Sequence, residues 1–226
     1  MNHGTVLITG ANRGLGLEFS RQYAADGWHV IACCRDPKDA PELKKLKTEV
    51  HALDVTSQES IDHLAKTLKG KPIDVLVNNA GTHGDRRPFG ETDVALWKQI
   101  FAVNTIAPYQ VLAALLDNLV AGAQKKVVNI SSKVGSIGDG PSGGSYAYRS
   151  SKTALNMVMM NAAHELRNHG ITILLIHPGW VQTDMGGPSA PVTIEQSITG
   201  VRRIIDKATP AETGHFYDYT GRQLPW

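Results

Sequence analysis

The sequence contains few cysteines and no histidine cluster beside them. Cys33 and Cys34 are the only cysteines among 226 residues, and they are adjacent in an apolar segment. Neighbouring side chains on a strand point to opposite faces, so an ordinary disulfide between the two would be strained. The pair predicts reduced thiols and a cytoplasmic location. Without a histidine cluster nearby, the cysteines do not indicate a metal site, and none is predicted.

Other features that the sequence lacks exclude further classes of protein. No apolar run approaches the roughly 20 residues that span a bilayer, and no signal-peptide pattern follows Met1. The formal net charge is only +2, and lysine and arginine are scattered, which predicts neither nucleic acid nor membrane as a partner. There are no internal repeats or low-complexity linkers. With 42% hydrophobic residues, the chain is expected to form a single domain over residues 1–226.

Short apolar runs alternate with helical patterns along the whole chain. We expect strands at 5–9, 28–34, 51–55, 73–77, 126–130, 171–176 and 216–219. Helical periodicity lies between them, for example at 61–68, 95–119 and 194–205. Strands that alternate with helices predict an α/β fold with a doubly wound parallel sheet and helices on both faces.

The first expected strand ends in a glycine-rich turn that leads into a helical pattern. Glycines let the backbone approach phosphate groups closely, and the first turn of a helix presents free N–H groups to them. The turn therefore predicts nucleotide binding, and a purely structural tight turn is the alternative. Its residues are Gly10, Ala11, Asn12, Arg13, Gly14, Leu15 and Gly16.

Tyr148 and Lys152 are four residues apart in a segment with helical character. At this spacing the two side chains project from the same face of a helix. An ammonium beside a phenol favours the phenolate, so we expect Lys152 to lower the pKa of Tyr148 from its usual value near about 10. The pair is a candidate acid/base set. The alternative is a chance pair on a solvated helix face.

Five motifs occur in one order along the chain. They are the glycine spacing G-x-x-x-G-x-G, the sequence Asn-Asn-Ala-Gly ending at Gly81, a lone Asn104, the Ser/Tyr/Lys set, and Pro178-Gly179. Together they resemble the short-chain dehydrogenase/reductase family, which implies a Rossmann-like fold. The Tyr-Arg-x-Ser-Lys core and the final Tyr-x-Gly-Arg-x-x-Pro-Trp resemble its C-factor and sniffer-type carbonyl reductases.

The resemblance implies an NADPH-dependent oxidoreductase that moves a hydride between nicotinamide and a small to medium carbonyl or alcohol substrate. It implies that Tyr148 is the acid, that Ser132 orients the substrate oxygen, and that Lys152 tunes Tyr148 and holds the nicotinamide ribose. Asn104 would hold a relay water. Ser131 stays an alternative to Ser132, because adjacent side chains leave a strand in opposite directions.

The same resemblance assigns a set of cofactor contacts. Arg35 favours NADP(H), because arginine accommodates a 2′-phosphate and Cys34 stands where NAD-preferring members carry Asp; Asp36 leaves NAD(H) open. Asp54 has an alternative role at a helix start. The predicted contacts are Gly10, Asn12, Arg13, Gly14, Leu15, Gly16, Arg35, Asp54, Val55, Asn79, Ala80, Gly81, Tyr148, Lys152, Pro178, Gly179, Val181 and Thr183.

Two other functions stay open at this stage. One is an NADP(H)-binding sensor or signalling protein with incidental catalysis, and the other is an NAD-dependent alcohol dehydrogenase. The loops 82–92, 133–146 and 180–191 are expected to line the substrate pocket, with Tyr146 and Trp180 as an apolar wall. His177, before a turn, is expected to be structural. A homodimer or homotetramer is predicted from the family.

Overall fold

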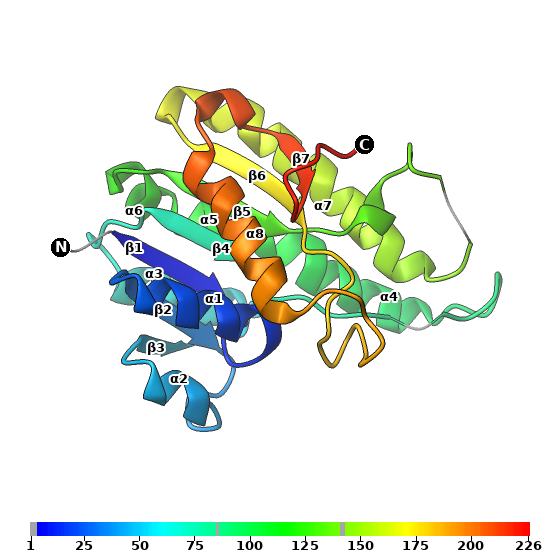
Figure 1. Ribbon diagram of the computed structural model, residues 1–226, viewed down its shortest axis with the longest axis horizontal. Coiled ribbons are helices and arrows are strands. Elements are labelled where there is room, and N and C mark those ends of the chain that lie inside the picture. The colour runs from blue at the N-terminus through cyan, green and yellow to red at the C-terminus, as the bar shows by residue number, and fades with distance from the viewer. Residues whose placement is uncertain (1–3, 85, 141–142) are drawn as a thin grey trace.

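The computed structural model describes residues 4–84, 86–140 and 143–226. Its centre is a seven-stranded parallel sheet in the order β3-β2-β1-β4-β5-β6-β7 (Figure 1). This confirms the predicted parallel sheet. The strands are β1 (Thr5–Thr9), β2 (His29–Cys34), β3 (Glu49–Ala52), β4 (Val75–Asn78), β5 (Lys126–Ile130), β6 (Thr172–His177) and β7 (His215–Asp218).

Helices cover both faces of the sheet, as a doubly wound fold requires. One face packs against α1 (Gly14–Ala25), α2 (Pro41–Lys45) and α8 (Ile194–Lys207), and Figure 1 shows α1 and α8 crossing in front of the strands. The other face packs against α3 (Gln58–Thr67), α5 (Ala107–Ala114), α6 (Leu116–Ala121) and α7 (Tyr146–Glu165). Helix α4 (Val94–Phe101) packs on α7.

The two cores follow from the alternation of side chains along each strand. In β1, Leu7 enters the core under α3, α5 and α7, while Val6 and Ile8 enter the core under α1 and α8. All three are fully buried. A strand buried on both faces needs an almost continuous apolar run, which is the pattern that the sequence displays in its first strand.

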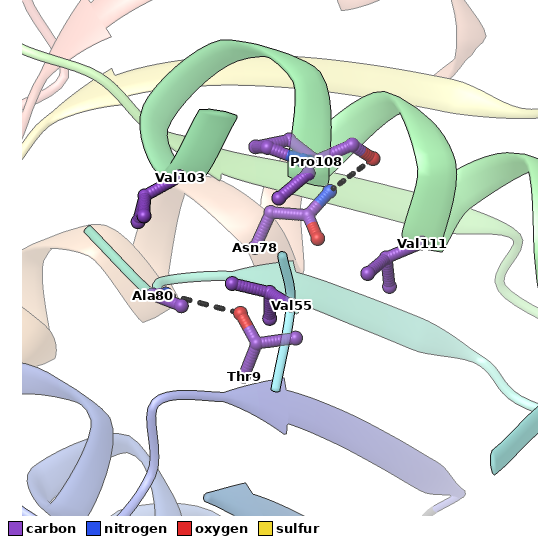
Figure 2. Close-up of a pocket in the computed structure, with 8 residues that line it drawn as sticks. Thr9, Val55, Asn78, Ala80, Val103, Pro108 and Val111 are labelled. Carbon is purple, nitrogen blue, oxygen red and sulfur yellow. Dashed lines mark hydrogen bonds between the residues drawn. The ribbon is translucent and has the colours of Figure 1, made fainter. Parts of the chain in front are cut away.

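Strand order reverses between β1 and its two neighbours, β2 and β4. In open α/β sheets, ligands bind outside the carboxyl ends of the strands at such a point. Figure 2 shows a narrow pocket here, with side chains from β1, β4 and α5 around it. Thr9 accepts a hydrogen bond from the Ala80 N–H at 3.0 Å, which joins the ends of the two central strands.

Two elements differ most from their predicted bounds. The third strand was predicted at 51–55 but lies at Glu49–Ala52, because Asp54 accepts from the N–H of Thr56 and turns the chain toward α3. The helix predicted at 95–119 is divided into α4, a π-helical turn at Ala102–Ile106, α5 and α6.

Parts of the expected pocket loops lie outside the described residues, namely 85 and 141–142. Short 3₁₀ turns are found at Lys133–Gly135, Leu166–His169 and Pro210–Glu212. Within the three described ranges, no helix has the length and apolar character to cross a membrane.

His177 ends β6, and its Nδ1 atom is buried without a hydrogen-bond partner among the described residues. Burial lowers the pKa of His177 to about 4, with Asp218 acting in the opposite direction. The ring is therefore neutral at working pH, in keeping with the structural role expected for it.

Stability should consequently fall as the pH is lowered from about 6.5 to about 4. Over this window the unfolded histidine takes up a proton that the folded ring does not bind, which costs at most about 3 kcal/mol. Urea unfolding of wild type and His177→Gln at pH 7, 6 and 5 checks this. The variant should lose less stability than wild type, and equal losses would contradict the assignment. The exposed His63→Gln is the control.

Candidate active site

Tyr148 and Lys152 lie on the first turns of α7, at the carboxyl edge of the sheet. The Lys152 ammonium lies over the Tyr148 ring, 5.9 Å from its centroid. It is buried and donates a hydrogen bond of 2.8 Å to the carbonyl of Ile130, the last residue of β5. Burial lowers the pKa of Lys152 to about 8. Helix α7 is thereby attached to the strand that leads into Ser131 and Ser132.

The two serines point to different neighbours. Ser131 donates to the Oδ1 atom of Asn156 at 2.6 Å and is buried on the α7 side. Ser132 forms a side-chain hydrogen bond with Tyr148. The geometry therefore favours Ser132 as the hydroxyl beside the phenol, which was the preferred assignment from sequence.

The pKa of Tyr148 differs from the expectation. Burial raises it, and the hydrogen bond from Ser132 acts in the opposite direction. The expected lowering by Lys152 is absent in this arrangement, because the ammonium lies over the ring and donates to Ile130. A raised pKa keeps the phenol protonated, which suits a proton donor.

Asn104 lies in the π-helical turn between α4 and α5 and is fully buried. Its amide donates to the Thr82 carbonyl at 2.9 Å and to the Ser151 hydroxyl at 3.0 Å, and its oxygen accepts from the Thr82 N–H at 2.9 Å. π-helical turns inside α-helices are frequent at functional sites. Asn104 thus connects the loop after β4 to the residue next to Lys152.

The glycine turn has the tight geometry that a phosphate cradle needs. Gly10 and Gly14 have positive φ angles of 65° and 54°. A Cβ on Gly16 would lie 2.2 Å from the Gly10 carbonyl oxygen and 2.6 Å from Nδ2 of Asn79, so only glycine fits there. Helix α1 starts at Gly14, and Arg13 provides no side-chain cap for it, which leaves the first-turn N–H groups for a ligand.

Asn79 holds this turn in place. Its Nδ2 atom donates to the carbonyls of Thr9 and Gly10, at 2.9 and 3.1 Å. Gly81 lies on the side of Lys152 and Asn104, where a Cβ would be 3.9 Å from the Lys152 ammonium nitrogen. The Asn-Asn-Ala-Gly motif therefore joins the glycine turn to the Tyr/Lys pair.

The residues after β2 and β3 lie at the same edge. Arg35 is exposed directly after β2, while Asp36 accepts from the N–H of Lys38 in a local turn. Hydrogen bonds from Thr56 lower the pKa of Asp54, and Arg35 adds to this effect. Asp36 thus forms a local turn, and Asp54 forms a turn with Thr56 just before α3, whose N-cap is Ser57. Val55 lines the pocket in Figure 2.

The segment after β6 approaches the glycine turn from the other side. Pro178 accepts from Ser197 at 2.6 Å, and Gly179 has a φ of 91°. Thr183 lies near Gly14, where a Cβ would be 3.7 Å from its Cγ2 atom. An exposed ion pair of 2.9 Å joins Arg13 to Asp184. The remaining predicted contacts at this edge are Asn12, Leu15 and Val181.

One residue beside Tyr148 had no predicted role. The His83 ring lies 5.0 Å from the Tyr148 ring, centroid to centroid. Its only signal in the sequence is its position two residues after Asn-Asn-Ala-Gly. Of the expected aromatic wall, Tyr146 contacts Phe89 edge to face, and Trp180 is exposed and donates to the Gly186 carbonyl.

The parallel sheet, the glycine turn and the Ser/Tyr/Lys/Asn set occur together in one family of proteins. The family model described as short chain dehydrogenase matches residues 4–191. The chain belongs to this family of oxidoreductases. The resemblance inferred from the motifs is confirmed.

The chain is also similar to individual members of this family. The chain is 43% identical to C-signal of Myxococcus xanthus over 69% of this chain and 93% of that protein. It is 38% identical to a 1-hydroxy-2-glutathionyl-2-methyl-3-butene dehydrogenase of Rhodococcus sp. strain AD45, over 98% and 99% of the two chains. NADPH-bound carbonyl reductase from chicken fatty liver has a TM-score of 0.93 at 34% identity over the full length of both chains. Carbonyl reductase Sniffer of D. melanogaster also has a TM-score of 0.93, at 30% identity over 99% of each chain.

The close approach of α1 to the glycine turn at Gly16 can be tested by substitution. Alanine in a helix normally stabilises relative to glycine by up to about 1 kcal/mol. At Gly16 the added Cβ meets backbone, so Gly16→Ala should instead destabilise by roughly 1–3 kcal/mol in urea unfolding.

Gly81→Ala is the matched control, because its Cβ would have ordinary contacts from 3.5 Å. Its free energy of unfolding should change by less than about 0.5 kcal/mol. A Gly16→Ala variant as stable as wild type would show that α1 does not approach the turn as described.

Proposed function

We propose that this protein is an NADPH-dependent carbonyl reductase. The observation that carries the proposal is an arrangement of three side chains: the Ser132 hydroxyl is hydrogen-bonded to the Tyr148 phenol, and the buried Lys152 ammonium lies over the Tyr148 ring. This set lies at the carboxyl edge of the sheet, close to a glycine turn that fits a dinucleotide. The likeness to two carbonyl reductase structures supports the same activity.

The residues present fit a nicotinamide dinucleotide. The uncapped start of α1 and the glycines at 10, 14 and 16 would receive the pyrophosphate. Lys152 and the Asn79–Gly81 segment would hold the nicotinamide ribose, with Pro178, Val181 and Thr183 along its other side. When bound, the cofactor supplies the hydride for the carbonyl carbon.

The side chains of the site supply the remaining chemistry. Tyr148 donates its hydroxyl proton to the oxygen of the substrate as negative charge develops there. Ser132 donates a hydrogen bond to the same oxygen and orients it. Lys152, positively charged below its pKa of about 8, lies over the Tyr148 ring and would hold the nicotinamide ribose beside it. Asn104 anchors the loop and the helix around this set, and we assign to it the water through which Tyr148 regains its proton.

Tyr148→Phe should lower kcat for carbonyl reduction by about 10²–10⁴-fold, because it removes the proton donor and keeps the ring. NADPH should still bind, as measured by fluorescence titration. Tyr217→Phe, on the edge strand β7, is the control and should keep wild-type turnover. Wild-type turnover in Tyr148→Phe would exclude the proposed chemistry.

Preference for NADP(H) rests on Arg35, which is exposed directly after β2, and on the local turn that occupies Asp36. A guanidinium is suited to a 2′-phosphate. The NADP(H)-bound state of the chicken enzyme supports this choice.

Arg35→Ala should weaken NADPH binding about tenfold or more and leave NADH binding within about twofold. Isothermal titration with both cofactors checks the difference. Lys38→Ala, a nearby exposed change, is the control. Equal losses for both cofactors, or none, would remove Arg35 from this role and reopen NAD-dependent alcohol oxidation.

A signalling role is the second candidate, favoured by the 43% identity to C-signal. The complete Ser/Tyr/Lys/Asn set favours catalysis, since a sensor has no need of a proton donor. NADPH oxidation with any carbonyl of a broad panel separates the two.

We further infer a homodimer through the apolar side chains exposed on α5 and α7, such as Tyr109 and Met157. Sedimentation velocity tests this oligomeric state. A cytoplasmic location, suggested by the two free cysteines, stays a prediction.

A further inference from the structure

His83 lies beside the proposed proton donor, and the mechanism above does not use it. The planes of the His83 and Tyr148 rings are tilted by 37°, with centroids 5.0 Å apart. The side chain is half-buried. Within the described part of the chain, neither ring nitrogen has a hydrogen-bond partner, so both are available to a ligand.

The backbone holds His83 in this position from both sides. On one side, Thr82 is fixed by two hydrogen bonds of 2.9 Å with the buried amide of Asn104. On the other side, a Cβ at Gly84 would lie 2.6 Å from Ile100 and 3.7 Å from Ala147, so the chain passes close to α4 and α7. Two such anchors restrict the backbone at His83 and so limit where its ring can lie.

The imidazole of His83 is suited to hydrogen bonding with a hydroxyl group of a ligand. A neutral imidazole has one donor and one acceptor nitrogen, which matches a hydroxyl, itself both donor and acceptor. The reacting oxygen of the substrate must reach the Tyr148 hydroxyl. A ring 5.0 Å from the Tyr148 ring can then reach the atoms bonded to the reacting carbonyl carbon.

We propose that His83 determines substrate specificity by hydrogen bonding to a hydroxyl on the carbon next to the reacting carbonyl. The preferred substrates would then be α-hydroxy ketones. This inference rests on the proposed carbonyl reductase function. A site built to hydrogen-bond a substrate hydroxyl discriminates against the analogue that lacks it, because the polar group of the site is left unpaired.

Three ketones that share one ring test the proposal with NADPH. They are acetophenone, 2-hydroxyacetophenone, which carries the adjacent hydroxyl, and 4′-hydroxyacetophenone, which carries a hydroxyl far from the carbonyl. Wild type should have a kcat/KM for 2-hydroxyacetophenone about tenfold above that for acetophenone, the size of one good hydrogen bond. The 4′-hydroxy compound should show no such increase over acetophenone.

His83→Phe keeps a ring against Tyr148 and removes both nitrogens. It should abolish the tenfold preference, while kcat/KM for acetophenone stays within about threefold of wild type. His83→Gln keeps a donor and an acceptor and should restore most of the preference. The control is His63→Phe, an exposed substitution on α3, which should change neither value.

The outcomes separate this inference from the function on which it rests. Equal loss of activity on all three ketones in His83→Phe would indicate a structural role and overturn the inference. An unchanged preference in that variant would overturn it too. NADPH titration shows whether the variant is folded; should His83→Phe fail to bind, His83→Leu takes its place. Wild type that is inactive on all three ketones would instead overturn the proposed reductase function, and this inference with it.

Discussion

The ammonium of Lys152 is buried in the protein, and its position constrains the rest of the site. A buried charge is costly unless it has hydrogen-bond partners, and the described partner is the Ile130 carbonyl at the end of β5. That contact fixes the first turns of α7 against the strand that leads to Ser132. Tyr148, one turn earlier on α7, is held against Ser132 by the same contact. Loss of the contact would displace three of the proposed catalytic groups together.

A second buried polar group, Asn104, connects this pair to the cofactor side. Its amide bonds both Ser151, next to Lys152, and Thr82, just after Gly81. Asn79 continues the connection to the glycine turn through two backbone carbonyls. These hydrogen bonds, together with the backbone from Asn79 to Thr82, thus connect the residue next to Lys152 to the glycine turn. Such networks rigidify a site, because any unpaired member is costly.

The sequence predicted most of this arrangement because its signals were local. Glycine spacing and strand periodicity fixed the nucleotide turn and the parallel sheet, and helical spacing placed Tyr148 and Lys152 on one face. The features of the site that the sequence did not predict depend on contacts between segments far apart in the chain. Three features were not predicted: the π-helical turn around Asn104, the hydrogen bonds of Asn104 with Thr82, and the approach of His83 to Tyr148. Each depends on how helices and loops pack together.

The direction in which the pKa of Tyr148 is shifted is the clearest example of a property that the sequence did not predict. Sequence spacing predicted a lowering by Lys152, since only their separation along a helix was known. The structure adds burial, which raises the pKa, and places the ammonium over the ring with its hydrogen bond directed to Ile130. Desolvation is a property of the packed site, so no spacing rule contains it.

The central claim is that this edge of the sheet brings a nicotinamide and a carbonyl together beside Tyr148. Transfer of isotope tests it most directly. NADPH that carries deuterium at both hydrogen positions of its reactive carbon is incubated with wild type and an aryl ketone, and the product is analysed by mass spectrometry. The expected product is an alcohol with one deuterium on the former carbonyl carbon. Oxidation of the cofactor without deuterium in the product would contradict the central claim.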